Sequence, residues 1–176
     1  AEWLNGPITE LGAVVATHRD PDRGSFAAED TAYLTCRFAN GSIGVLQACA
    51  MAWAGTSMGQ THHLDIHGSA GRLTAYNDWD TVQRVNFVAD GAADPGIELP
   101  LTDEAGRPLD ESVRLDSVHN TYRDIFRSTN AMTRAWVTSI ATGTHCRPDF
   151  ADGARVQHLI DAALTSVAND GQMGRV

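Results

Sequence analysis

The sequence contains no lysine, and all 13 of its basic residues are arginine. A phosphate-binding lysine of the Walker type, a Schiff-base lysine and a lysine that polarises a carbonyl group are therefore excluded for this chain. Cysteine is scarce as well, since Cys36, Cys49 and Cys146 are widely spaced and form no CxxC pair. This spacing argues against a disulfide framework and a zinc ribbon, and it predicts ordinary buried thiols in a reducing cytoplasm.

Long apolar runs are also missing from the chain. No run approaches the roughly 18 apolar residues that span a bilayer, and residues 1–5 have neither the basic start nor the apolar stretch of a signal peptide. We therefore expect a cytoplasmic protein that has no membrane partner. The 22 acidic residues outnumber the 13 basic ones and give a net charge of -9, which argues against a nucleic-acid partner.

The pattern of apolar residues changes along the chain. The first two-thirds alternate with the period of a β-strand, and the last third has helical spacing, with the switch near Asp116. A length of 176 residues with 43% hydrophobic residues is typical of one soluble domain. Together these features predict a single α+β domain in which two long C-terminal helices cover one face of a sheet.

The clearest strand pattern begins at Glu29 and ends at Asn40-Gly41, a pair that tolerates the positive φ angles of a type I′ hairpin turn. A second strand is expected from Ser42 to about Trp53. The apolar face of the strand before the turn is made of Ala32, Leu34, Cys36 and Phe38.

Other strands are expected on both sides of this hairpin. Residues 8–18 fit a first strand, and residues 62–67 fit a strand that turns through Gly68–Gly71 into residues 72–76. The apolar runs at 82–88 and 97–101 favour two edge strands.

Two helices are expected near the C-terminus. The first starts at Asp116 or Ser117 and ends at Gly143, and the second follows Pro148-Asp149 and stops at Asn169–Gly171. Each has one apolar stripe that a sheet can cover.

The glycine pattern of a dinucleotide-binding fold is absent. Gly41 with Gly44 and Gly68 with Gly71 lack a third glycine and a following helix, so we interpret both pairs as hairpin turns. The chain is therefore expected to bind no cofactor by itself.

Gly55–Gly59 fits the GxSxG motif of a serine hydrolase, with Ser57 as the nucleophile. That motif requires a turn from a strand into a helix, whereas the residues after it predict another strand. A hydrolase that uses Ser57 is kept as an alternative.

His63, Asp65 and His67 alternate along an expected strand and so share one face. Such a face could hold a metal, form the polar side of a sheet or line a substrate cleft. His119, Asn120 and Tyr122 cluster with Arg123 at the start of the first long helix, where free N–H groups favour hydroxyl-rich or anionic ligands. The alternative is that they are surface residues of the first turn, with Tyr122 packing on the sheet. Our candidate substrate site consists of Trp53, which is either a packing residue or a sugar-stacking one, together with His63, Asp65, His67, His119, Asn120 and Tyr122.

Several motifs follow one another in a recognisable order. They are Trp3–Ile8, Glu29–Ala32, Arg37–Gly44 and Leu64–Leu73, followed by Asn120, Tyr122, Phe126, Trp136–Ile140, Gly143, Pro148, Asp152-Gly153, Gln157, Ile160–Ala162 and Ser166. This order, over nearly the whole chain, resembles the C-terminal domain of the glucose–fructose oxidoreductase, inositol dehydrogenase and rhizopine catabolism family (Gfo/Idh/MocA).

The resemblance implies a parent protein that transfers hydride between a nicotinamide, of NAD or NADP, and a hydroxyl carbon of a sugar or polyol. Members of this family resemble one another in having an N-terminal Rossmann domain and an open, mostly antiparallel sheet that shapes the substrate site and often mediates oligomerisation. The present chain matches the second part only, which predicts a homo-oligomer through the sheet face. The glycine fingerprint, the lysine of a Glu-Lys-Pro motif, and the aspartate and histidine of the helix before Trp3 are all missing, so no catalytic residue is assigned.

Three hypotheses follow from the sequence. The first is the substrate-binding and assembly domain of such an oxidoreductase, inactive by itself. The second is a standalone α+β binding or scaffold module, and the third is a hydrolase or a metal-dependent enzyme.

Overall fold

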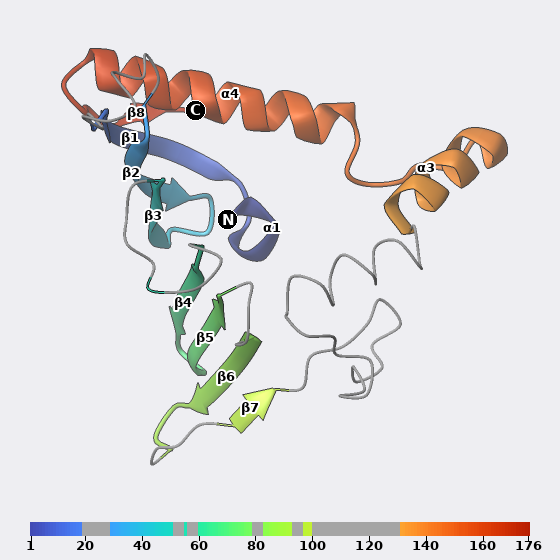
Figure 1. Ribbon diagram of the computed structural model, residues 1–176, viewed down its shortest axis with the longest axis horizontal. Coiled ribbons are helices and arrows are strands. Elements are labelled where there is room, and N and C mark those ends of the chain that lie inside the picture. The colour runs from blue at the N-terminus through green and yellow to red at the C-terminus, as the bar shows by residue number, and fades with distance from the viewer. Residues whose placement is uncertain (19–28, 51–54, 56–59, 79–82, 93–96, 100–130) are drawn as a thin grey trace. The chain divides into compact units, whose positions relative to one another are not determined.

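The computed structural model describes residues 1–18, 29–50, 55, 60–78, 83–92, 97–99 and 131–176. Contacts divide the chain into two units (Figure 1). The first unit comprises Ala1–Ala52 and His145–Val176, and the second comprises Trp53–Thr144.

The first unit contains a four-stranded antiparallel sheet with the order β3-β2-β1-β8. The first strand that we expected at residues 8–18 is present as β1, and the strand after Ser42 is present as β3. The elements of this unit are α1 (Glu2–Asn5), β1 (Ile8–Ala16), β2 (Thr31–Phe38), β3 (Ile43–Cys49), α4 (Phe150–Ala168) and β8 (Gly174–Arg175).

A compact apolar core lies on one face of this sheet. On β2 the predicted apolar face is confirmed, because Cys36 and Phe38 are buried while Tyr33 on the other face is exposed. On β1 the register shifts between Ile8 and Glu10, and this irregularity lets Ile8 share a face with Leu11 although they are three positions apart.

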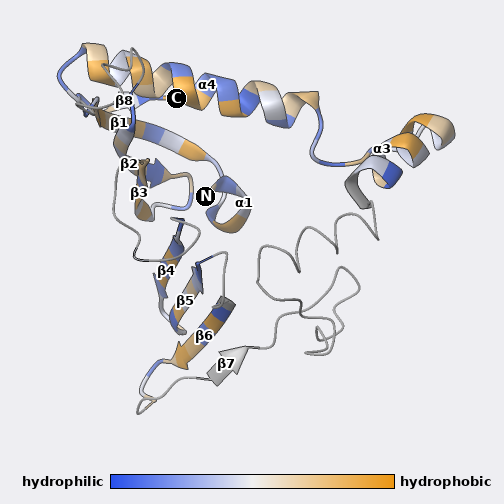
Figure 2. Cartoon of the chain, viewed as in Figure 1, coloured by the Kyte–Doolittle hydropathy of each residue, from blue (hydrophilic) through white to orange (hydrophobic). Residues whose placement is uncertain are grey.

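The helix α4 covers this core, and Figure 2 shows apolar bands that recur between polar bands along it. Leu159, Ala162 and Ala163 pack against the buried strand residues. The start that we expected at Pro148-Asp149 is confirmed, because the Asp149 carboxylate accepts a hydrogen bond from Asp152 N in a capping box. This hydrogen bond from Asp152 N, together with the one between the Asp149 carboxylate and the His145 ring, lowers the pKa of Asp149.

Contacts far apart in sequence hold α4 in place. The Arg155 guanidinium donates to the Glu2 carboxylate at 2.7 Å and to the Ile8 carbonyl at 2.6 Å, and it lowers the pKa of Glu2. Near the other end of α4, the buried Ser166 hydroxyl accepts from Ala13 N and donates to the Gln172 carbonyl. The N-terminal helix, the central strand and the C-terminal segment are therefore all tied to α4.

The first hairpin is confirmed, but the predicted type I′ turn is wrong. A type I′ turn needs positive φ at both central residues, and among the described residues that are not glycine only Asp170 has positive φ. Instead, the Gly41 N–H donates to the Phe38 carbonyl and closes a turn over residues 38–41, and Gly41 itself has φ 87°. Asn40 stabilises this turn with its side chain, because its Oδ1 accepts from both the N–H and the hydroxyl of Ser42.

The second unit contains a four-stranded antiparallel sheet with the order β4-β5-β6-β7. The residues that we expected to form an edge strand at 82–88 instead form an inner strand, β6, because the short strand β7 covers its outer side. The elements of this unit are β4 (His62–Gly68), β5 (Gly71–Asn77), β6 (Gln83–Ala89), β7 (Ile97–Leu99) and α3 (Ala131–Thr142).

The predicted turn between β4 and β5 is confirmed, with Gly68 opposite Gly71. Gly71 has φ 142°, and a Cβ built there would lie 2.1 Å from the Val88 carbonyl oxygen. Only glycine allows β6 to approach this closely.

The predicted α+β class and the antiparallel pairing are confirmed. Of the first long helix, the structure describes α3, which ends before Gly143 as expected, while the expected start at Asp116 or Ser117 lies outside the described residues. Within the described ranges, no helix combines the length and apolarity needed to cross a membrane.

Candidate functional site

One face of the sheet in the second unit is predominantly polar. Residues that stand opposite each other on antiparallel strands point to the same face, so the register defines rows of side chains. One row is His63, Tyr76 and Arg84, a second is Asp65, Thr74 and Asn86, and a third is His67, Arg72 and Val88. We call these nine residues the polar face of β4–β6.

Asp65 lies at the centre of an ionic network on this face. Arg72 donates to both of its carboxylate oxygens, at 2.9 and 2.6 Å, and His67 Nε2 lies 3.2 Å from Oδ1. The hydrogen bonds from Arg72 lower the pKa of Asp65 to about 2, with smaller effects from His67. Asp65 is thus an ionised carboxylate whose charge Arg72 already neutralises.

The row of His63, Tyr76 and Arg84 has a different character. His63 and Arg84 are exposed and Tyr76 is half-buried. Among the described residues, no hydrogen bond or ion pair is found for these three side chains, so their donors are available to a ligand. A small hollow of about 160 Å³ adjoins this end of the sheet, lined by these three residues together with His62, Leu64, Ala75, Asn77 and Val85.

The prediction that His63, Asp65 and His67 share a face is confirmed by the register of β4 with β5. Asp65 and His67 contact each other, but His63 does not join their network. Over the described residues, no three His, Cys, Asp or Glu side chains are arranged to hold a metal ion. The other candidates, Trp53, His119, Asn120 and Tyr122, and the serine Ser57 of the hydrolase alternative, lie outside the described residues.

Sequence reasoning missed Arg72, Tyr76 and Arg84. The hairpin turn could have identified the first two, because counting outward from Gly68 and Gly71 places Arg72 opposite His67 and Tyr76 opposite His63. No local signal marked Arg84, since its row depends on how β6 pairs with β5.

A second polar cluster joins the ends of β1 and β2. The Asp30 carboxylate accepts hydrogen bonds from His18 N at 2.7 Å and from the Thr31 hydroxyl at 2.9 Å, and His18 Nδ1 lies 2.7 Å from its Oδ1. The hydrogen bond with the His18 side chain is the main cause of the lowered pKa of Asp30. Both carboxylate oxygens of Asp30 are therefore already used in hydrogen bonds, which leaves little for a ligand.

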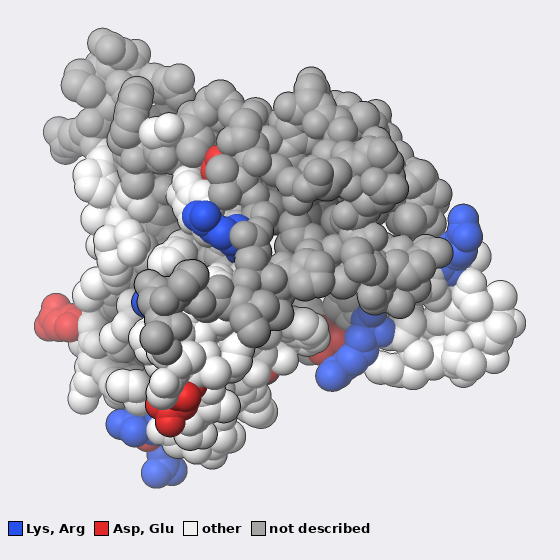
Figure 3. All heavy atoms as spheres, turned by 90° about the horizontal axis from the view of Figure 1, so that it is seen from below, with Lys and Arg blue, Asp and Glu red and all other residues white. Residues whose placement is uncertain are grey.

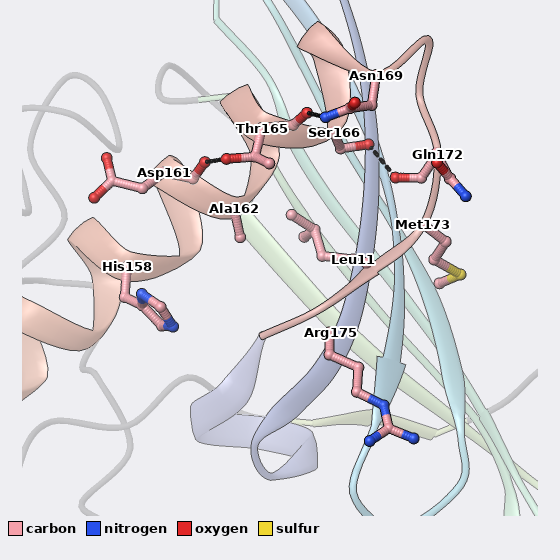
Figure 4. A pocket seen from close by; sticks show the side chains of 11 residues that line it. Leu11, His158, Asp161, Ala162, Thr165, Ser166, Asn169, Gln172, Met173 and Arg175 are labelled. Atoms are coloured by element: carbon pink, nitrogen blue, oxygen red, sulfur yellow. Dashed lines mark hydrogen bonds between the residues drawn. The ribbon is translucent and has the colours of Figure 1, made fainter.

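A larger hollow, of about 430 Å³, lies beside the end of α4 in the first unit (Figure 4). Its side chains include Leu11, His158, Asp161 and Arg175. Several of its other polar groups are already used, because Thr165 and Asn169 each bond to a carbonyl one turn earlier in α4, and Ser166 bonds to the Gln172 carbonyl.

Charge gives no stronger indication of a site. On the face drawn in Figure 3, acidic and basic side chains of the described residues lie in small separate groups, with no extended area of one sign. On the polar face of β4–β6, the side chains of His63, Tyr76 and Arg84 lie in one row and pair with no other described residue.

The described residues do not fit a dinucleotide. Such a site needs a glycine-rich turn that leads from a strand into a helix, because the N-terminus of that helix binds the phosphates. The glycines at 41, 68 and 71 instead lie in turns between antiparallel strands.

Comparison with solved structures shows what the fold is similar to. A levoglucosan dehydrogenase in complex with NADH and levoglucosan superposes with a TM-score of 0.74 at 24% identity, covering 100% of this chain and 47% of that one. An oxidoreductase from Agrobacterium radiobacter, in complex with NAD+, L-tartaric acid and magnesium, gives a TM-score of 0.70 at 19% identity, covering 99% and 45%. An oxidoreductase domain protein from Kribbella flavida gives 0.64 at 23% identity, covering 96% and 44%.

The chain thus spans less than half the length of these solved proteins. No curated protein matches it significantly. The family model described as the oxidoreductase family, C-terminal alpha/beta domain, matches residues 1–174. The chain therefore belongs to the Gfo/Idh/MocA oxidoreductase family, as its C-terminal alpha/beta domain.

Proposed function

We propose that this chain is the substrate-binding and assembly domain of a longer, cytoplasmic NAD(P)-dependent oxidoreductase that acts on a sugar, a polyol or a related hydroxy compound. The observation that carries the proposal is the family match over residues 1–174. Similar folds occur in proteins solved with NADH and levoglucosan, and with NAD+ and L-tartaric acid. These ligands support a nicotinamide cofactor and a small hydroxylated substrate.

In this proposal the chain binds substrate and the nucleotide lies on another part of the parent protein. The cofactor would supply the hydride chemistry, while side chains of this domain bind and orient the hydroxyl groups. The residues that we propose to contact substrate are Trp53, His63, Asp65, His67, His119, Asn120 and Tyr122. Of these, His63 has the clearest support, because it is exposed and forms no hydrogen bond with another described residue.

The first experiment compares the natural gene product with the 176-residue chain. Intact mass should be well above the 18.9 kDa of this sequence, and NADH or NADPH fluorescence should respond to the longer protein but not to the chain. A natural product of 18.9 kDa that binds no nucleotide would instead favour a standalone module. Nucleotide binding by the 176-residue chain itself would contradict the proposal that the nucleotide site lies on another part of the parent protein.

The second experiment tests the site in the longer protein. His63→Ala should raise KM for the sugar or polyol about tenfold, as expected for the loss of one hydrogen bond of about 1.5 kcal/mol to a bound hydroxyl. His158→Ala is the matched control, because His158 is an exposed histidine of the first unit, on α4. Equal effects of both substitutions on KM would remove His63 from the site.

We further propose that the chain self-associates through the exposed face of its first sheet. The face opposite the core carries Tyr33, Ile43 and Val45, and the last two are 76% and 69% exposed. Apolar surface of this kind is typical of interfaces. Val45→Glu should therefore lower the mass of the assembly measured by sedimentation. The control Val156→Glu changes an exposed residue of α4 and should leave that mass unchanged. A monomeric parent chain would contradict the proposal.

A further inference from the structure

The row of His63, Tyr76 and Arg84 presents three polar groups on adjacent strands, none of which is paired with another described residue. Opposite residues on antiparallel strands have Cβ atoms roughly 5 Å apart, so the row extends about 10 Å across the sheet. The row contains a guanidinium, a phenol hydroxyl and an imidazole, which together supply several donors over the length of a small molecule.

The charge of this row favours an anion. Arg84 is exposed and has no carboxylate partner among the described side chains. The carboxylate of the next row, Asp65, is held in a bidentate pair with Arg72 and so does not compensate Arg84. This cationic position stands out in a chain whose net charge is -9.

The neighbouring row determines what kind of anion fits. Thr74 and Asn86 lie two residues from Tyr76 and Arg84 on the same face, which is roughly 6–7 Å along the strands. A hydroxyl and an amide at that distance suit the hydroxyl groups of a ligand whose carboxylate lies on Arg84, because guanidinium groups bind carboxylates in a bidentate geometry.

We infer that this row is a carboxylate subsite, and that the polar face of β4–β6 binds a polyhydroxy acid rather than a neutral sugar. The inference deepens the proposed function and rests on it, because it names the substrate class that the domain would accept. Arg84 binds the carboxylate, Tyr76 donates to it, and His63 contacts a hydroxyl group.

The test measures binding to the 176-residue chain with gluconate and with glucitol, a neutral polyol of equal carbon number. Histidine ring signals in NMR spectra report binding, with His63 as the probe and His158 as the internal reference. Gluconate should shift the His63 signals at lower concentration than glucitol. Arg84→Gln should weaken gluconate binding about tenfold, as for one lost charge-assisted hydrogen bond, and leave glucitol unchanged. Tyr76→Phe should weaken it about threefold or more.

The control is Arg134→Gln, which removes the same charge from an exposed residue of α3. An equal loss of gluconate binding in Arg134→Gln would show a general charge effect and overturn the subsite. Equal binding of gluconate and glucitol, insensitive to Arg84→Gln, would also overturn it while leaving polyol binding intact. Failure to bind gluconate at all would overturn it too, because the row is complete within β4–β6.

The proposed function fails by a different result. Gluconate binding that depends on Arg84, in a protein whose longer form never reduces a nicotinamide, would keep the carboxylate subsite and remove the oxidoreductase assignment.

Discussion

In the first unit one face of the sheet lies under α4, whereas in the second unit the face that carries His63 and Arg84 is polar. The buried apolar residues of the described chain, Ile8, Leu11, Ala13, Cys36 and Phe38, all belong to the first unit. The two sheets have four antiparallel strands each, so backbone geometry does not distinguish them. Their alternating side chains do.

This contrast separates stability from binding. A substitution in the core under α4 removes buried surface and should change the free energy of unfolding. A substitution on the polar face of β4–β6 removes an exposed donor and should change ligand binding, since exposed side chains contribute little to stability.

The largest expected effect is that of Leu11→Ala in the first unit. Leu11 is 2% exposed and lies in the core beneath α4, so truncation leaves a cavity. We expect the free energy of unfolding, measured by urea denaturation, to fall by about 2–5 kcal/mol. The control Val156→Thr alters a residue of α4 that is 56% exposed and should cost less than about 0.5 kcal/mol. Similar costs for the two would break the contrast between the core and exposed positions.

The next effect is that of Gly71→Ala in the second unit. Its Cβ would lie 2.1 Å from the Val88 carbonyl oxygen, and its φ of 142° disfavours any side chain. We expect the free energy of unfolding of this sheet to fall by about 1–3 kcal/mol, which would be measured as faster amide hydrogen exchange in β5 and β6. Gly68→Ala is the control from the same turn, because its Cβ would meet no atom nearer than 3.9 Å. If exchange in β1 and β2 accelerated equally, the two units would unfold together rather than separately.

Local patterns predicted much of this fold correctly. The alternation from Ala32 to Phe38 identified the buried face of β2, and the capping residues at Asp149 and Asn169 gave both ends of α4. These signals depend on neighbouring residues, whose chemistry is visible in the sequence.

Features that depend on distant residues were not predictable. The pair of Arg155 with Glu2 joins residues 153 positions apart, and the inner position of β6 depends on β7 beyond it. The turn at Asn40-Gly41 was misjudged because the Asn40 side chain bonds to Ser42, which a residue preference does not reveal. Likewise, the alternation of His63 with Asp65 predicted a shared face, but not that Arg72 pairs with Asp65 while His63 stays outside their network.

The smallest expected effect concerns the ion pair of Asp65 with Arg72 on the polar face of β4–β6. Arg72 lowers the pKa of Asp65 to about 2, below the ordinary value of about 3.9 for aspartate. Because the folded pKa is depressed, the pair stabilises the folded chain above about pH 4, and this contribution is lost as pH falls toward 2. A carboxyl 13C titration should give a pKa near 2 for Asp65, and Arg72→Gln should return it to the ordinary range.

The control for this titration is Arg134→Gln, which should leave the pKa of Asp65 unchanged because Arg134 is on α3 and forms no contact with Asp65 in the described structure. The shift should weaken in high salt, since both partners are partly exposed. If Arg72→Gln left the pKa of Asp65 unchanged, Arg72 would not be the group that neutralises the Asp65 carboxylate. Asp65 would then repel an anion at the neighbouring row. The polar face would no longer present Arg84 as an uncompensated positive charge, and this part of its contrast with the apolar core under α4 would be lost.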